Sequence, residues 1–162
     1  MKKLLIILLL FLLMKKAGAQ SSNHTNTTTI DYSISVDDST AIWAVLDSFM
    51  VNFRQPLEVY IKRHLQTYLF PHVRIASGTV TVIPNADSMP VNYWKARMPA
   101  NWDHSEWVTR KIVQAGAKKV HVAVVFRRFR KDNTVIADEA SLYILEKVNG
   151  KWGIRGRSSY AM

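Results

Sequence analysis

Glu139 is the residue whose type and expected surroundings best suit acid–base chemistry. The strand registers expected from the turns place its carboxylate between Phe126 and Tyr160, on the otherwise apolar side of a sheet. Because burial disfavours the ionised form, the pKa of such a carboxyl rises, and the group can act near neutral pH as a general base or acid. The Tyr160 hydroxyl would orient it, while Ser141 and Ser158 would bind a ligand carbonyl. The competing interpretation is a Glu139 that is solvated at an open rim, or that only binds Tyr160.

Two turns predict these registers. Asn149-Gly150, between two strand-like runs, favours a two-residue type I′ hairpin because both turn positions need a positive φ. The hairpin predicts three facing pairs: Val148 with Lys151, Ser141 with Ser158, and Glu139 with Tyr160. The connection at residues 131–134 predicts that Phe126 faces Glu139. The side of the sheet that carries Phe126 is therefore the expected core face.

The opposite side of this sheet offers a second set of candidates. His121, Arg155 and Arg157 are expected there, together with Arg127, which faces Asp138 and most simply forms a cross-strand ion pair with it. If the two sides are exchanged, His121 and Arg157 become the pocket pair and could bind a carboxylate or an enolate, since histidine titrates near neutral pH. Otherwise this side is an outer surface or the interface of a homodimer.

A third group of candidates precedes the sheet. Trp94, Trp102 and Trp107 flank Asp103-His104, whose adjacent acid and base invite a catalytic interpretation. Adjacent residues seldom point to one spot, and an aromatic loop more often covers a core, so we expect a lid. Trp94, Trp102 and His104 are then candidate walls of a pocket for an apolar or flat ligand.

Other site chemistries lack their sequence patterns. The chain has five histidines without metal-ligand spacing, no glycine-rich phosphate loop and no Gly-x-Ser-x-Gly turn, so the sequence predicts neither a metal nor a cofactor. It has no cysteine, which excludes disulfides, thiol catalysis and thiolate metal sites. Any catalysis would therefore be cofactor-free acid–base chemistry.

The start of the chain indicates export. Residues 1–19 combine a basic start, an apolar run from Leu4 to Met14 and small residues before a predicted cut at Gln20, which is the pattern of a signal peptide. The apolar run is too short to span a bilayer comfortably, so we expect no stable membrane insertion after cleavage and a periplasmic or secreted location. Four of the lysines behind the formal charge of +10 lie here, which weakens a nucleic-acid interpretation. Residues 20–36, rich in Ser, Thr and Asn, predict a flexible leader.

Residues 37–162 are expected to form one domain. Apolar residues at helical spacing follow a helix-start signal at Asp37-Asp38, and a second such pattern follows Pro56. The expected elements are helices at about 37–53 and 57–65, strands at 73–75 and 79–83, a weaker helix at 87–98, and antiparallel strands at 107–115, 118–130, 135–146 and 152–160. Helices on one face of a largely antiparallel sheet define an α+β fold.

This order of elements resembles the nuclear transport factor 2-like (NTF2-like) superfamily, particularly its SnoaL-like bacterial members, over about residues 38–160. The run Val73 to Gly78 and the ending Asn149-Gly150-Lys151-Trp152-Gly153-Ile154, followed by Arg157-Ser158-Ser159, carry the resemblance. It implies a cone-like, cystatin-like α+β roll, often dimeric, in which a curved mixed or antiparallel sheet wraps around three helices and encloses an apolar pocket. Ketosteroid isomerases, dehydratases, epoxide hydrolases, polyketide cyclases and non-catalytic binding domains are members, so the fold leaves the reaction open.

The sequence therefore favours an exported SnoaL-like domain that binds a small, mainly apolar molecule. One alternative is an isomerase, dehydratase or epoxide-hydrolase type of enzyme that uses Glu139 and Tyr160. The other is a non-catalytic module that dimerises through the face expected to carry His121 and Arg157.

Overall fold

The computed structural model describes residues 33–52, 57–89 and 97–160, all within one structural unit of residues 31–162. The predicted signal peptide (1–19), residues 20–32 of the predicted leader, and Trp94 lie outside the described residues. Most of the predicted helix at 87–98 does too, and a single 3-10 turn, η2 (Ala86–Ser88), is described at its start. None of the helices within the described ranges is long and apolar enough to cross a membrane.

Helix α2 (Val36–Asn52) begins where the sequence predicts a helix start. The Ser35 hydroxyl oxygen accepts a hydrogen bond from the backbone N–H of Asp38 (3.1 Å). Asp37 and Asp38 occupy the first turn, where the helix dipole favours negative charge. The helix turns one apolar face toward the sheet, formed by Ile42, Leu46, Phe49 and Met50.

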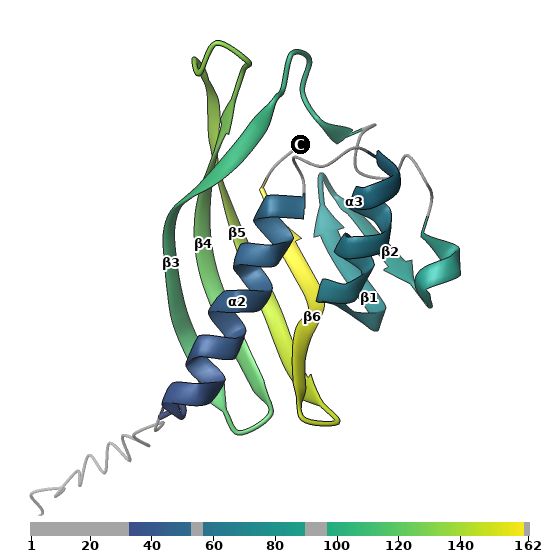
Figure 1. The fold of residues 1–162 in the computed structure, drawn as a ribbon, viewed down its shortest axis with the longest axis vertical. Helices are drawn as coiled ribbons and strands as arrows, with labels where there is room; N and C mark the ends of the chain where they lie inside the picture. The colour runs from purple at the N-terminus through teal and green to yellow at the C-terminus, as the bar shows by residue number, and fades with distance from the viewer. Residues whose placement is uncertain (1–32, 53–56, 90–96, 161–162) are drawn as a thin grey trace, which may run out of the picture. The chain divides into compact units, whose positions relative to one another are not determined.

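Helix α3 (Leu57–His64) follows, and a 3-10 turn, η1 (Leu65–Thr67), joins it to the sheet. In Figure 1, α2 crosses strands β5 and β6, while α3 lies over β1 and β2. The helices thus cover the inner face of the sheet, which is the face that holds the core.

Six strands form one curved sheet in the order β2-β1-β6-β5-β4-β3. They are β1 (Tyr68–Ala76), β2 (Thr79–Ile83), β3 (His104–Gly116), β4 (Lys119–Phe129), β5 (Val135–Val148) and β6 (Lys151–Ser159). Strand β1 runs parallel to β6, and each other neighbouring pair is antiparallel. This arrangement confirms the α+β class and the mixed sheet. Strand β1 is longer than the predicted strand at 73–75 because its first residue pairs with distant β6, a contact that no local pattern reveals.

The register between β4 and β5 is the predicted one. Phe126 faces Glu139, and Arg127 faces Asp138. The Arg127 guanidinium donates to both carboxylate oxygens of Asp138 (2.6 and 2.7 Å), which confirms the predicted ion pair. Glu139 therefore lies on the inner face of the sheet.

The hairpin of β5 and β6 begins in the predicted register and then leaves it. Asn149 and Gly150 have positive φ values of 50° and 79°, and Val148 faces Lys151. After Leu145 pairs with Ile154, a β-bulge adds one residue, Arg155, to β6. Beyond it, Tyr143 faces Arg157 and Ser141 faces Ser159. The predicted pairs Ser141 with Ser158 and Glu139 with Tyr160 are therefore wrong, and Arg157 lies on the inner face.

Contacts with β5 and β1 hold the bulge in place. The Arg155 guanidinium donates from Nε to Glu146 (2.8 Å) and from Nη1 to the carbonyl oxygen of Phe70 on β1. A Cβ atom on Gly156 would lie 3.1 Å from the carbonyl oxygen of Val73, which is tighter than ordinary contact. The missing side chain at Gly156 thus allows β1 to approach the bulged strand closely.

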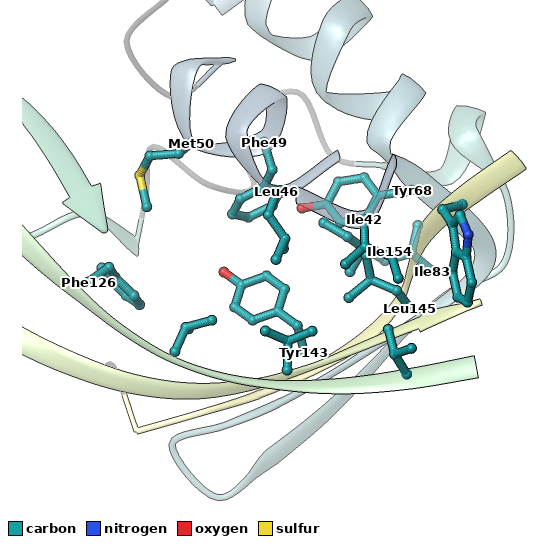
Figure 2. Packing of buried hydrophobic residues seen from close by; sticks show 14 of the residues in the cluster. Ile42, Leu46, Phe49, Met50, Tyr68, Ile83, Phe126, Tyr143, Leu145 and Ile154 are labelled. Carbon is teal, nitrogen blue, oxygen red and sulfur yellow. The ribbon is translucent and has the colours of Figure 1, made fainter. Parts of the chain in front are cut away.

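The core lies between α2 and the inner face of the sheet, and Tyr143 is at its centre (Figure 2). The Tyr143 ring meets Phe49 edge-on at a centroid distance of 5.5 Å and Trp107 at 5.9 Å. In Figure 2 its hydroxyl points from the sheet toward Phe49 of α2. The predicted core face is confirmed by the burial of Val120, Val122, Val124, Phe126, Tyr143, Leu145, Trp152 and Ile154.

Candidate functional site

A pocket opens on the inner face of the sheet beside the C-terminal part of α2. It has about 320 Å³ of free space, including the part that opens to solvent. The enclosed part of this space is large enough for a bound water. The apolar lining consists of Phe49, Met50, Met98 and Phe126, and the polar lining of Ser105, Arg128, Tyr143 and Arg157.

Arg157 reaches this pocket because of the bulge in β6. Its Nη1 donates a hydrogen bond to the Tyr143 hydroxyl oxygen (3.0 Å), and its guanidinium carbon lies 5.6 Å from the centroid of the Tyr143 ring. Arg74 of β1 is paired with Arg157 in the parallel ladder and is also buried. Two arginines on adjacent strands thus place positive charge on the inner face.

Arg128 of β4 is the third buried arginine, with 7% of its surface exposed. Its guanidinium carbon lies 5.6 Å from the centroid of the Phe126 ring, and its Nη1 lies 3.4 Å from Oε1 of Glu139. Within the described ranges its Nε has no hydrogen-bond acceptor. Burial lowers the pKa of Arg128, the Glu139 carboxylate partly offsets this, and the positive charge of Arg157 lowers it further. The environment of Arg128 is therefore short of negative charge.

The positive charges of all three arginines act on the Tyr143 hydroxyl. Burial raises the pKa of Tyr143, and the positive charges of Arg157, Arg74 and Arg128 each oppose that rise. The Tyr143 hydroxyl is therefore neutral and lies within the electrostatic influence of all three arginines.

Two buried histidines lie beside these arginines. His72 donates from Nδ1 to the carbonyl oxygen of Ile154 (3.3 Å), which leaves Nε2 as the acceptor of the neutral ring. His64 Nε2 is 2.8 Å from the Tyr68 hydroxyl. Burial and the positive charge of Arg157 lower the pKa of both histidines, that of His72 to about 4. Both rings are therefore neutral at physiological pH.

The predicted catalytic pair is not brought together. Glu139 lies on the inner face as predicted, but its partner is Arg128, and it is not part of the pocket lining. The Tyr160 side chain is 84% exposed. Of the predicted ligand-binding hydroxyls, Ser141 is buried and donates to Ser159 (2.7 Å), whereas Ser158 is exposed. The bulge accounts for these differences, since it reverses the sides of Ser158 and Tyr160.

The other predicted pocket residues have separate places. Phe126 lines the pocket as predicted, and Trp102 instead borders a shallow open groove at the end of β4. The His104 ring stacks on Phe129 at 4.8 Å, and its Nδ1 is 2.8 Å from Asp103. His121 faces Ile144 on the outer side, so the dimer face predicted to carry both His121 and Arg157 lacks the arginine.

Sequence reasoning missed Arg128, Arg74 and most of the pocket lining, and it placed Arg157 in the pocket only in the alternative with exchanged sides. Arg128 was in principle predictable, because alternation along β4 places it on the same side as Phe126. Arg157 and Arg74 gave no such signal, since their orientation depends on the bulge and on the parallel pairing of β1 with β6. Among the described residues no group of three His, Asp or Glu side chains could hold a metal ion.

The mixed six-strand sheet with helices over its inner face and a pocket between them defines an NTF2-like, cystatin-like fold. A family model described as NTF2-like protein (DUF6841) matches residues 37–161, and the chain belongs to this family. No curated protein matches the chain.

Solved structures share the fold at low sequence identity. A protein of unknown function with a cystatin-like fold from Nostoc punctiforme superimposes with a TM-score of 0.65 at 10% identity, covering 80% of this chain and 94% of that one. An NTF2-like protein of unknown function from Shewanella oneidensis has a TM-score of 0.59 at 13% identity and 76% and 98% coverage. A ketosteroid isomerase-like protein from Erwinia carotovora has a TM-score of 0.57 at 16% identity and 79% and 98% coverage.

Proposed function

We propose that this chain is an exported NTF2-like domain that binds a small molecule with an apolar body in the pocket between α2 and the sheet. The observation that carries the proposal is the pocket lining: the rings of Phe49 and Phe126 and the side chains of Met50 and Met98 surround free space next to a few polar groups. A mostly apolar cavity with a small number of converging polar groups is typical of small-molecule sites. Methionine side chains also adapt readily to different ligand shapes.

The names of two structural neighbours support small-molecule binding in this pocket. Among them are the ketosteroid isomerase-like protein and a putative aromatic ring hydroxylase from Novosphingobium aromaticivorans, with a TM-score of 0.57. Their names concern apolar ring compounds, and at 12% and 16% identity they support the pocket as a ligand site without identifying its ligand.

We favour binding over acid–base catalysis because Glu139 is paired with Arg128. A catalytic carboxylate must come within hydrogen-bond reach of a substrate proton. Glu139 instead lies 3.4 Å from the Arg128 guanidinium and outside the pocket lining. The enzyme alternative therefore requires Glu139 to leave Arg128 when a substrate binds.

The test of the binding function uses gently purified protein and native mass spectrometry, followed by denaturing release of any bound compound. Ligand-observed NMR with neutral and charged aromatic and aliphatic compounds extends the test to protein that is purified empty. We expect one-to-one binding that is abolished by Met98→Trp, which fills the pocket, and retained by Val135→Trp at an exposed position. If no compound copurifies and none of the panel binds, the proposed function is wrong.

Export is tested separately from binding. Expression of the full chain in a bacterium, followed by cell fractionation and intact mass measurement, should yield a periplasmic or secreted protein that begins at Gln20. An uncleaved protein in the cytoplasm would contradict export and would leave the binding proposal unaffected.

A further inference from the structure

The polar wall of the pocket consists of hydrogen-bond donors. A guanidinium group donates hydrogen bonds and accepts none, so Arg128 and Arg157 are donors only. The Ser105 hydroxyl oxygen accepts from Trp102 Nε1 (3.0 Å), so its own O–H remains to donate. The Tyr143 oxygen accepts from Arg157 Nη1 (3.0 Å) and likewise retains its O–H. The four polar side chains that line the pocket therefore match a ligand group that only accepts hydrogen bonds.

We propose that the pocket binds a small organic carboxylate whose head group lies between Arg128 and Arg157. The inference rests on the proposed function and names the class of its ligand. The apolar tail lies against Met50 and Phe126, and in Figure 2 these two side chains lie on the same side of Tyr143. Guanidinium and carboxylate groups form short, charge-assisted and often bidentate hydrogen bonds, which are about twice as strong as neutral ones.

Arg128 is prepared for such a ligand. Its guanidinium is already desolvated, so a carboxylate that binds there meets a group whose burial cost is part of the folded state. Its one acidic neighbour among the described residues, Glu139, lies at 3.4 Å, longer than a charge-assisted hydrogen bond of about 2.7–2.9 Å. Its Nε has no acceptor there. A ligand carboxylate would accept the hydrogen bond from Arg128 that Glu139 does not accept.

Glu139 then competes with the ligand for Arg128. Both are carboxylates, and a guanidinium held by one binds the other less strongly. Removing the charge of Glu139 should therefore strengthen ligand binding, which is the opposite of what a catalytic or ligand-binding role for Glu139 predicts. This contrast makes Glu139→Gln an informative variant, because it keeps all three buried arginines.

The experiment measures the affinity of the full chain at pH 7.5 for two matched pairs of probes, benzoate with benzamide and hexanoate with hexanamide, and for phenyl phosphate. Each amide has nearly the shape of its acid but carries no charge. We expect the carboxylates to bind about 10- to 100-fold more tightly than the amides, the range expected for hydrogen bonds to charged groups. Arg128→Met should remove that difference, and Glu139→Gln should increase benzoate affinity.

Arg127→Met is the matched control. Arg127 precedes Arg128 in β4 but points to the outer side, where it pairs with Asp138, so its loss should leave benzoate affinity unchanged. If Arg128→Met does not fold, Glu139→Gln decides, since weaker benzoate binding by that variant would overturn the proposal.

The outcomes separate this inference from the proposed function. Amides that bind as tightly as the acids would overturn the carboxylate assignment and leave the pocket function standing. Phenyl phosphate that binds more tightly than benzoate would overturn it in favour of a phosphate ligand. Absence of binding by every probe would overturn the carboxylate assignment, and the proposed function falls too if native protein also carries no compound.

Discussion

Mild acid is expected to destabilise this domain through the buried histidines His64 and His72. Each is about 1% exposed. Burial lowers the pKa of His72, the hydrogen bond to the Ile154 carbonyl opposes this, and the positive charges of Arg157, Arg155 and Arg74 lower the pKa further, to about 4 in total. Burial also lowers the pKa of His64 well below its usual value, with smaller effects of the charges of Arg157 and His72.

The direction of the pH effect on stability follows from the pKa of His72 in the folded and the unfolded chain. An unfolded His72 has its usual pKa of 6.5, so between pH 6.5 and 4 the unfolded chain binds a proton that the folded chain does not. The free energy of unfolding therefore falls as the pH falls through this range. The change from 6.5 to about 4 is worth about 3 kcal/mol in full, and about 2 kcal/mol of it is lost between pH 7.5 and 5. His64 acts in the same direction.

Three carboxyl groups with lowered pKa values affect stability only at lower pH. Asp38, Asp132 and Asp138 have pKa values lowered from 3.8 by their hydrogen bonds, so the stability that they contribute is present above that value and is lost at lower pH. A loss between pH 7.5 and 5 therefore reports on the histidines.

The assay is urea unfolding followed by tryptophan fluorescence at several pH values from 7.5 to 5. His72→Asn places an amide nitrogen near the position of Nδ1, keeps a donor for the Ile154 carbonyl and removes the titrating ring, so its pH dependence should be shallower by about 2 kcal/mol over this range. Ile83→Val is the matched control. Ile83 pairs with His72 across β1 and β2, and its truncation should lower stability equally at every pH. A wild-type protein whose stability is constant from pH 7.5 to 5, or a His72→Asn variant with the full wild-type slope, would refute the reasoning.

Two further stability predictions have matched controls. Gly153→Ala should lower the free energy of unfolding in urea by about 1–3 kcal/mol, because the new Cβ would lie 2.8 Å from Leu69 Cγ. Gly116→Ala should be neutral, since the nearest atom to its new Cβ lies at 3.8 Å. Equal effects of the two substitutions would show that β1 shifts at little cost. Tyr143→Phe should cost about 1–3 kcal/mol by removing one hydrogen-bond acceptor of the buried Arg157 guanidinium, and Tyr160→Phe at a largely exposed position should change nothing. A silent Tyr143→Phe would mean that water replaces the hydroxyl.

The sequence was sufficient for the fold, for the register between β4 and β5, and for the start of the hairpin of β5 and β6. Alternation and the Asn149-Gly150 turn predicted the core face and the contact of Phe126 with Glu139, because both depend on residues near in sequence. The candidate site depended on a bulge, which shifts every later residue of β6 by one side, and on a parallel pairing between β1 and β6. Those features arise from contacts between distant segments. The register error therefore exchanged Arg157 with Ser158 and removed the positive charge from the expected pocket.

The bulge at Arg155 also means that the chemistry of this pocket depends on how β6 pairs as well as on side-chain identity. If the same residues paired regularly beyond Leu145 and Ile154, Ser158 would face Ser141 and turn inward, and Arg157 would face Leu142 and turn outward. Neutral hydroxyls would then take the place of Arg157 beside Arg128 without a single substitution. Related domains that pair this last strand regularly would therefore select different ligands on the same backbone scaffold.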